Sequence, residues 1–247
     1  MQHYFIEKAK PTDGVVELPA DVAKHFVRVL RSEIGEQVEL VLSDHHVYLA
    51  ELVAVEDRQA RCKIIKDLDR NVELPVDITL VCGLPKQSKP EIIVQKSTEL
   101  GVANVIFTSM ERSIVNWNGK ADKKISRLQE VAKSAAEQSH RNVIPKVSYA
   151  NDLSMIDLAS YNAKVIAYEE AAKQGEESNL SKVFSQMKTG ESGLFVIGPE
   201  GGVSDSEMDW MTGEGFVSAG LGPRILRTET APFYVLAAAS YYFELSH

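Results

Sequence analysis

Leu194-Phe195-Val196-Ile197 runs directly into Gly198-Pro199-Glu200-Gly201-Gly202, and this stretch decides how the second half of the chain folds. Four consecutive apolar residues are typical of a strand that is buried on both faces, as in a parallel sheet. Three glycines in the next five residues allow positive φ angles and a close approach of the backbone to a ligand. A tight turn between a strand and a helix would use glycines equally well, so this loop alone leaves both interpretations open.

Two more strand-like segments end in unusual loops. The strand expected at 216–221 runs into Gly222-Pro223-Arg224-Ile225-Leu226-Arg227-Thr228-Glu229-Thr230-Ala231, and the strand expected at 164–168 ends at Glu169-Glu170. Open α/β sheets bind ligands at the carboxyl ends of their parallel strands. We therefore expect the three loops to contribute to one binding site.

The chain from residue 76 onward alternates between strands and helices, which predicts a parallel sheet with helices on both faces. The expected strands are 76–84, 102–110, 164–168, 193–198 and 216–221, and the expected helices are 90–100, 122–140, 179–187, 205–211 and one that begins near 232. The last helix is apolar on every side from 233 to 243, so it must be buried all round. Burial inside one chain and burial in a dimer interface both satisfy this pattern.

The first 69 residues have a different pattern. Short strands are expected at 4–6, 15–18, 37–42, 47–55 and 60–65, with one helix at 20–31. Five short strands and one helix predict a small β-barrel-like module. The charged segment 67–75 ends in Pro75, and we place the boundary there, between domains 1–72 and 73–247.

The composition is that of an ordinary folded protein, with 44% hydrophobic and 25% charged residues. The longest apolar stretch, 233–243, is shorter than the roughly 20 residues that span a bilayer. No signal peptide is visible at the N-terminus, and Cys62 and Cys82 lie in apolar runs that predict buried thiols. We expect a cytoplasmic protein that does not associate with membranes.

The net charge of −8 is unusual for a protein that binds nucleic acid, but phosphate binding needs only a local basic patch. Two segments offer one. The segment 24–31 carries Lys24, Arg28 and Arg31, which either contact phosphates or, for Arg31, complement the helix dipole. The second patch is interpreted more readily as the solvated face of an amphipathic helix, and its members are Lys120, Lys123, Lys124, Arg127 and Lys133.

Several common sites are absent from the sequence. It contains no Gly-x-Gly-x-x-Gly dinucleotide fingerprint, no phosphate-binding P-loop and no Gly-x-Ser-x-Gly nucleophile elbow. The six histidines, which include the pair His45-His46, have no cysteine or carboxylate partners at the short spacings of metal-ligand motifs. We expect no metal, and a nicotinamide-dependent oxidoreductase becomes a weak alternative.

The two C-terminal glycine loops resemble the paired signature of the SPOUT methyltransferases. The closest resemblance within that group is to the bacterial family that methylates uridine N3 in small-subunit ribosomal RNA. Further segments match this family in chain order: His25-x-x-x-Val29-Leu30-Arg31, Lys96-x-Thr98-Glu99-Leu100-Gly101-Val102, Glu111-Arg112-Ser113 and Glu137-Gln138-Ser139-x-Arg141. The resemblance therefore covers nearly the whole chain.

The resemblance implies an α/β fold: a small PUA-like RNA-binding β-barrel over 1–72 and a SPOUT α/β domain with a trefoil knot over 73–247. It also implies a homodimer, ribosomal RNA as partner and S-adenosyl-L-methionine (SAM) as cofactor in the knot. The residues expected to bind the cofactor are Tyr168, Glu169, Ile197, Gly198, Pro199, Glu200, Gly201, Gly202, Leu221, Gly222, Ile225, Leu226, Arg227 and Thr230.

Uridine N3 holds a proton at neutral pH, so its methylation needs a base or a cationic site that favours the anion. Arg141, Arg227 and Arg112 are candidates to stabilise the anion, and Glu200 or Glu229 could accept the proton. Arg227 and Glu229 could equally pair with each other and brace their loop.

Contacts with RNA are expected from Lys24, Arg28, Arg31 and Arg112. Two alternatives stay open: a methyltransferase of this architecture that acts on another RNA position, and an RNA-binding factor that transfers no methyl group.

Overall fold

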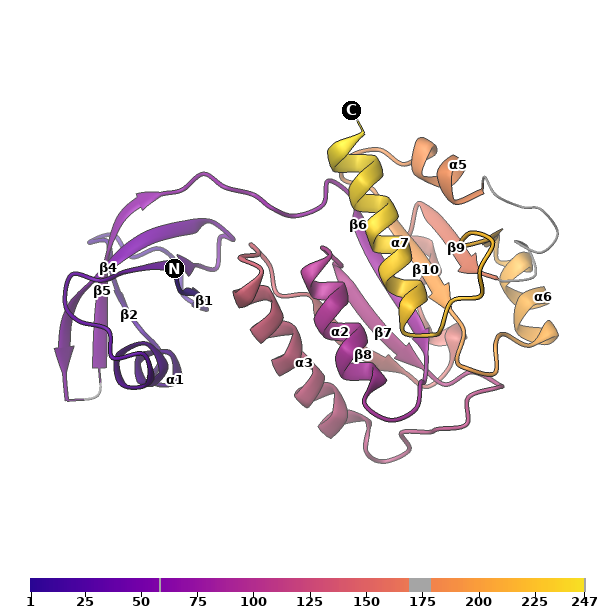
Figure 1. Cartoon of the computed structure of the whole chain (residues 1–247), viewed down its shortest axis with the longest axis horizontal. Helices are drawn as coiled ribbons and strands as arrows, with labels where there is room; N and C mark the ends of the chain where they lie inside the picture. Colours follow the sequence, from indigo (N-terminus) through magenta and orange to yellow (C-terminus); the bar gives the residue numbers. More distant parts are fainter. Residues whose placement is uncertain (58, 169–178, 247) are drawn as a thin grey trace. The chain divides into compact units, whose positions relative to one another are not determined.

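The computed structural model describes residues 1–57, 59–168 and 179–246, and these form two compact units (Figure 1). The N-terminal unit consists of Met1–Glu73 together with Ala136–Val143. The C-terminal unit consists of Leu74–Ala135 and Ile144–His247. Residues 136–143 thus belong to the N-terminal unit, although the sequence analysis assigned them to the second domain.

The N-terminal unit is built on a five-stranded sheet in the order β1-β3-β4-β5-β2. Its strands are β1 (His3–Phe5), β2 (Val15–Glu17), β3 (Gln37–Val41), β4 (Val47–Glu56) and β5 (Gln59–Asp67). Phe26, Leu40 and Leu52 are among the fully buried side chains of its core. All five expected strands are present.

The helix of this unit differs from the one expected at 20–31. α1 (Ala20–Ala23) passes into a π-helical segment, η1 (Lys24–Val29), in which Leu30 N–H donates to the His25 carbonyl at 3.0 Å. A π-helical turn is wider than an α-helical turn, so it rotates the residues that follow. Val29 and Leu30 are consequently exposed, whereas Phe26, on the preceding turn, is buried.

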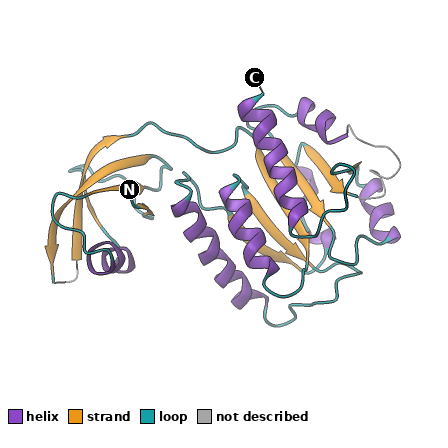
Figure 2. Cartoon of the chain, viewed as in Figure 1, coloured by secondary structure: helices purple, strands orange, loops and turns teal. Residues whose placement is uncertain are grey.

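The C-terminal unit contains a six-stranded parallel sheet in the order β11-β9-β10-β6-β7-β8 (Figure 2). Its strands are β6 (Asp77–Gly83), β7 (Asn104–Thr108), β8 (Lys146–Ala150), β9 (Ala163–Ala167), β10 (Ser192–Ile197) and β11 (Val217–Ala219). β8 was not predicted. It is an edge strand in which only Val147 is buried, so its sequence lacks an apolar run.

Helices cover both faces of this sheet, as the alternation of strands and helices predicted. The longer helices are α2 (Lys89–Glu99), α3 (Ala121–Gln138), α5 (Asn179–Gln186), α6 (Asp205–Gly213) and α7 (Thr230–Ser240). Successive residues of a strand point to opposite faces: Phe195 packs in the core with α2, α3, α5 and α7, and Val196 in the core with α6.

The last helix is buried on one side only. Val235 and Leu236 of α7 lie in the core, but Tyr234 is 38% exposed. The π-helical turn that follows, η4 (Tyr241–Leu245), exposes Tyr241 and Leu245 by 64% and 71%. The expectation of burial all round is therefore not met within one chain.

Within the described residues, no helix combines the length and the apolar character that crossing a membrane requires.

Candidate active site

Three neighbouring parallel strands end at the same level of the sheet. In the strand register, Ala167 at the end of β9 lies beside Ile197 of β10 on one side and beside Ala219 of β11 on the other. The segments that follow these strands line one pocket with a volume of about 660 Å³. The three loops therefore converge, as expected from the topology of a parallel sheet.

Most of the expected cofactor-binding residues line this pocket. They are Tyr168, Ile197, Gly198, Pro199, Glu200, Gly201, Gly202, Leu221, Gly222, Ile225, Leu226 and Arg227. Glu169 lies outside the described residues, and Thr230 starts α7 without lining the pocket. Arg112, which was expected to contact RNA, is part of the lining, and so are residues that the sequence analysis did not select: Lys89, Ala167, Val203, Pro223, Arg224, Thr228 and Ala231.

The glycines of the loops are required by close packing and by backbone conformation. A Cβ atom on Gly201 would lie 2.8 Å from the carbonyl oxygen of Arg112 and 2.9 Å from its Cβ atom. Gly222 has a φ angle of +80°, which side chains other than glycine rarely adopt. The two loops are also joined, because the Thr228 hydroxyl donates to the Gly198 carbonyl at 3.4 Å.

A lysine from α2 holds the two loops together. Lys89 Nζ lies 2.9 Å from Glu200 Oε1 and 3.0 Å from Glu229 Oε2, and the Lys86 N–H donates to the same Glu200 oxygen at 3.1 Å. Glu229 therefore pairs with Lys89, whereas the sequence analysis had considered Arg227 as its partner. Lys89 was missed because it is 111 residues from Glu200, and no local motif marks it.

These contacts make both glutamates weak bases. Burial works to raise the pKa of Glu200, but the hydrogen bonds from Lys89 Nζ and the Lys86 N–H outweigh it, and the pKa lies below its ordinary value. Burial works to raise the pKa of Glu229 as well, but hydrogen bonds from the backbone and from Lys89 outweigh it, and this pKa also lies below its ordinary value. Both carboxylates are ionised at neutral pH, so bracing the loops is the role that their contacts favour.

The arginines expected in the site divide between the two units. Arg112 and Arg227 line the pocket with exposed side chains. Arg141 belongs to the N-terminal unit, where it is only 4% exposed and forms an ion pair with Glu73. The Arg141 Nε atom lies 3.2 and 3.1 Å from the two carboxylate oxygens. The contacts of Arg141 therefore resemble those of a structural residue.

The pocket suits a cofactor such as SAM in its size and its walls. Its volume falls within the range of roughly 300–1,000 Å³ found for small-molecule sites. Ile197 and Leu221 are buried apolar walls, while Ile225 lines the pocket with 71% of its surface exposed. At Gly202 nothing lies within 4 Å of the position that a Cβ atom would occupy, so the loop leaves open space there. An adenine ring can pack on the apolar walls, and backbone groups of the loops remain close to it.

The residues expected to contact RNA in the N-terminal unit are all exposed. Lys24 and Arg28 lie on η1, and Arg31 follows it with a φ angle of +60°. The second basic patch is partly engaged within its own unit: Arg127 pairs with Glu91 at 3.3 Å, and Lys124 Nζ lies 5.3 Å from the centroid of a Trp117 ring.

Comparison with known proteins shows which class of enzyme has this fold and pocket. Residues 72–240 match the model of the RNA methyltransferase domain, and residues 18–65 match that of the RNA methyltransferase PUA domain. The protein is therefore an RNA methyltransferase with an α/β catalytic domain and a PUA-like β domain.

Individual relatives narrow the class to a family. The chain is 40% identical to ribosomal RNA small subunit methyltransferase E of Bacillus subtilis, over 99% of this chain and 98% of the relative. The enzyme of that name from Neisseria gonorrhoeae, solved with bound S-adenosyl methionine, has a TM-score of 0.83 at 28% identity over 98% of both chains. A Legionella pneumophila methyltransferase in complex with SAM has a TM-score of 0.81 at 30% identity over 96% of both chains. The chain belongs to the ribosomal RNA small subunit methyltransferase E family, which confirms the resemblance seen in its motifs.

Proposed function

We propose that this protein transfers the methyl group of SAM to N3 of a uridine in 16S ribosomal RNA of the small ribosomal subunit. The observation that carries the proposal is the pocket formed at the ends of β9, β10 and β11 by the two glycine loops. The relatives support it, since two are named for the small-subunit RNA and two are solved with the cofactor bound.

Bound SAM supplies a methyl group that its sulfonium already activates. The protein therefore needs to bind the cofactor, align the target nitrogen with the methyl group and polarise the uracil ring. Ile197, Leu221 and Leu226 line the pocket and would hold the adenine, and the backbone of 198–202 would enclose the rest of the cofactor. Arg227 and Arg112 favour the anionic form of the uracil ring, whose N3 proton is released to solvent. Bound SAM would supply its methyl group to the N3 anion and would leave as the neutral thioether. The paired Glu200 and Glu229 keep the loops in place.

The N-terminal domain, residues 1–72, is proposed to bind the RNA, and residues 73–247 to carry the transfer. The exposed Lys24, Arg28 and Arg31 would contact phosphates and so position the RNA without reading its sequence. The target uridine must be unpaired or flipped out of its stack to reach the pocket. The knot around the cofactor stays a prediction. We propose a cytoplasmic location as well, because the proposed substrate is ribosomal RNA, and fractionation of cells would check it.

Transfer is tested by incubating the protein and labelled SAM with small subunits that lack this methyl group, followed by mass spectrometry of the RNA nucleosides. We expect 3-methyluridine as the product. The Arg227→Ala variant should lower kcat by about 100-fold, the size of effect seen when one transition-state donor is removed. Its affinity for SAM should fall less than tenfold.

Arg127→Ala is the matched control, because Arg127 pairs with Glu91 and lies outside the pocket lining. A different methylated nucleoside would favour the alternative of another RNA position. SAM binding without transfer to any RNA tested would favour an RNA-binding factor that transfers no methyl group.

We also propose that the protein is a homodimer that buries the exposed side of its last helix. Tyr234, Tyr241 and Leu245 expose large hydrophobic side chains on α7 and η4, and exposed apolar surface that gathers in one place marks interaction sites. Sedimentation equilibrium at micromolar concentration should give twice the chain mass of 27.3 kDa. A monomer that persists at this concentration would contradict the proposal.

A further inference from the structure

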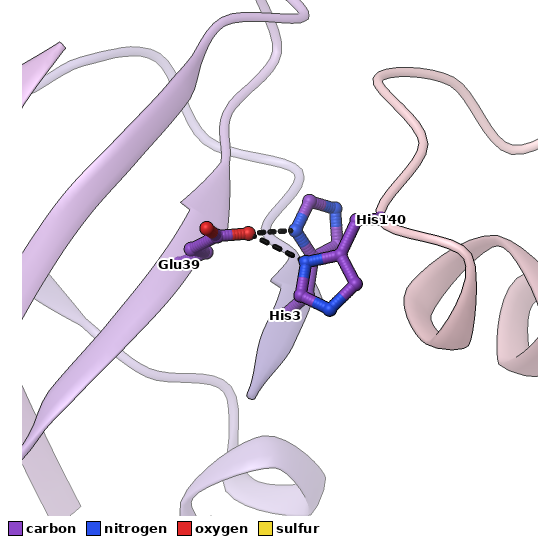
Figure 3. Close-up of side chains that lie close together, drawn as sticks. All are labelled: His3, Glu39 and His140. Atoms are coloured by element: carbon purple, nitrogen blue, oxygen red, sulfur yellow. Dashed lines mark hydrogen bonds and ion pairs between the residues drawn. The ribbon is translucent and has the colours of Figure 1, made fainter. Parts of the chain in front are cut away.

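The N-terminal unit contains a cluster of two histidines and one glutamate from three separate segments (Figure 3). His3 lies on β1, Glu39 lies on β3, and His140 follows α3 in the segment 136–143 of the same unit. Separations of 36 residues between His3 and Glu39 and 101 between Glu39 and His140 explain why short-range spacing in the sequence did not reveal the cluster.

Both imidazole rings present the same nitrogen to one carboxylate oxygen. His3 Nδ1 lies 2.9 Å and His140 Nδ1 2.7 Å from Glu39 Oε2, and the two ring centroids are 5.0 Å apart. The His3 and Glu39 side chains are 0% and 8% exposed, whereas that of His140 is 37% exposed. The cluster is therefore buried on one side and reachable from solvent at His140.

The hydrogen bond at the other nitrogen of His3 determines what its Nδ1 atom can do. His3 Nε2 lies 2.8 Å from the Arg141 carbonyl oxygen, which can only accept, so Nε2 carries the proton. In a neutral ring the bare lone pair of Nδ1 then faces a carboxylate oxygen, which is repulsive. A positive charge between ring and carboxylate removes the repulsion, and either a second proton or a metal ion can supply it.

Burial disfavours the second proton. Burial lowers the pKa of His3, although the hydrogen bonds that a charged ring would donate to Glu39 and to the Arg141 carbonyl oppose the shift. Glu39 remains ionised: burial works to raise its pKa, but its hydrogen-bond partners, Arg70 first among them, lower the pKa to about 2. The site thus places the anionic oxygen of Glu39 beside the Nδ1 atom of His3, while the other ring nitrogen of His3 is held by the Arg141 carbonyl.

We propose that His3 Nδ1, His140 Nδ1 and a Glu39 carboxylate oxygen bind one divalent transition-metal ion, with Zn²⁺ the best match. Two imidazoles and one carboxylate form a ligand set that zinc uses widely, with water in the fourth position. The Arg141 carbonyl accepts from the outer nitrogen of His3, as is usual for a histidine that binds a metal. All three ligand atoms lie within 4.8 Å of one another.

Two adjustments accompany binding. Tetrahedral zinc with bonds near 2.0 Å separates its ligands by about 3.3 Å, so the two nitrogens must each move about 0.5 Å from the oxygen. Arg70 donates to Glu39 Oε2 at 2.6 Å, and its partly exposed guanidinium must give up this oxygen. Once bound, the ion fastens segment 136–143 to the sheet of the N-terminal unit.

The test is calorimetric titration of the full-length protein, free of any tag, with ZnCl₂ at neutral pH. We expect one ion per chain, and at least a tenfold loss of affinity in His140→Ala, whose side chain is exposed enough to be replaced without unfolding the chain. His46→Ala is the matched control: His46 is an exposed histidine whose Nδ1 atom lies 2.7 Å from the Asp67 carboxylate, outside the proposed ligand set, and its removal should leave the affinity unchanged.

A second variant gains affinity and so cannot be explained by misfolding. Arg70→Gln removes the competing cation and should bind Zn²⁺ more tightly than the wild type. Co²⁺ in place of Zn²⁺ should give visible absorption bands of a tetrahedral site that vanish in His140→Ala. The proposal is overturned if the wild type takes up no Zn²⁺, or if the His140→Ala and His46→Ala variants bind it equally.

Discussion

Gly201→Trp is expected to abolish measurable binding of SAM. Even the first atom of a new side chain would lie 2.8 Å from the Arg112 carbonyl oxygen, a separation that real Cβ atoms essentially never show. The 198–202 loop therefore has to move, and the indole ring then competes with the cofactor for the pocket of about 660 Å³. Because this loop forms one wall of the pocket, we expect a loss of at least 100-fold, about 2.7 kcal/mol of binding free energy.

Calorimetric titration with SAM measures this effect, and Gly213→Trp provides the control. Gly213 ends α6, where nothing lies within 4 Å of the added atom, so the same substitution should leave SAM binding intact. Thermal unfolding of both variants shows whether each is folded. Wild-type affinity in Gly201→Trp would place the cofactor elsewhere, and a wild type that binds NAD instead of SAM would contradict the methyltransferase assignment.

Lys89→Met is expected to weaken SAM binding by about 10- to 100-fold. The change leaves Glu200 and Glu229, which both lie within about 3.0 Å of the lysine nitrogen, without their shared cation. Removing one partner of a partly buried charged pair costs about 1–3 kcal/mol. Repulsion between the two carboxylates should separate the loops after β10 and β11, and the pocket that they form should loosen.

Direct titration with SAM measures the loss, and two further variants separate its causes. Lys96→Met removes a lysine of the same helix that bonds Glu99 at the surface, and it should bind SAM like the wild type. Lys89→Arg keeps the charge and should recover part of the affinity. An unchanged affinity in Lys89→Met would show that the loops hold their positions without this bridge.

The strand and loop at 194–202 could be predicted because the information is local. An apolar run and a cluster of glycines are sufficient for a buried strand and a turn, and the topology of a parallel sheet then brings the loops together. Lys89 could not be predicted in this way, since it reaches Glu200 only in the folded chain. The π-helical turn at Lys24–Val29 was not predicted either, because the spacing of apolar residues does not distinguish a π-helix from an α-helix.

Arg141 illustrates a different limit of sequence analysis. The motif identified it as a functional arginine, whereas in the structure its guanidinium pairs with Glu73 inside the N-terminal unit. The motif indicates that an arginine is required at this position, but it does not distinguish a catalytic role from a structural one. Exposure and hydrogen-bond partners supply that distinction.

Segment 136–143 also determines whether the N-terminal unit can be separated from the rest of the chain. The chain leaves the N-terminal unit after Glu73 and returns to it for residues 136–143, so no single cut releases that unit whole. A fragment that stops at Glu73 lacks the backbone N–H groups of Asn142 and Val143, which donate to the Glu73 carboxylate at 2.8 and 3.1 Å. Grafting the β domain onto another enzyme would therefore need a second, non-contiguous peptide, and gene fusion at one junction cannot provide it.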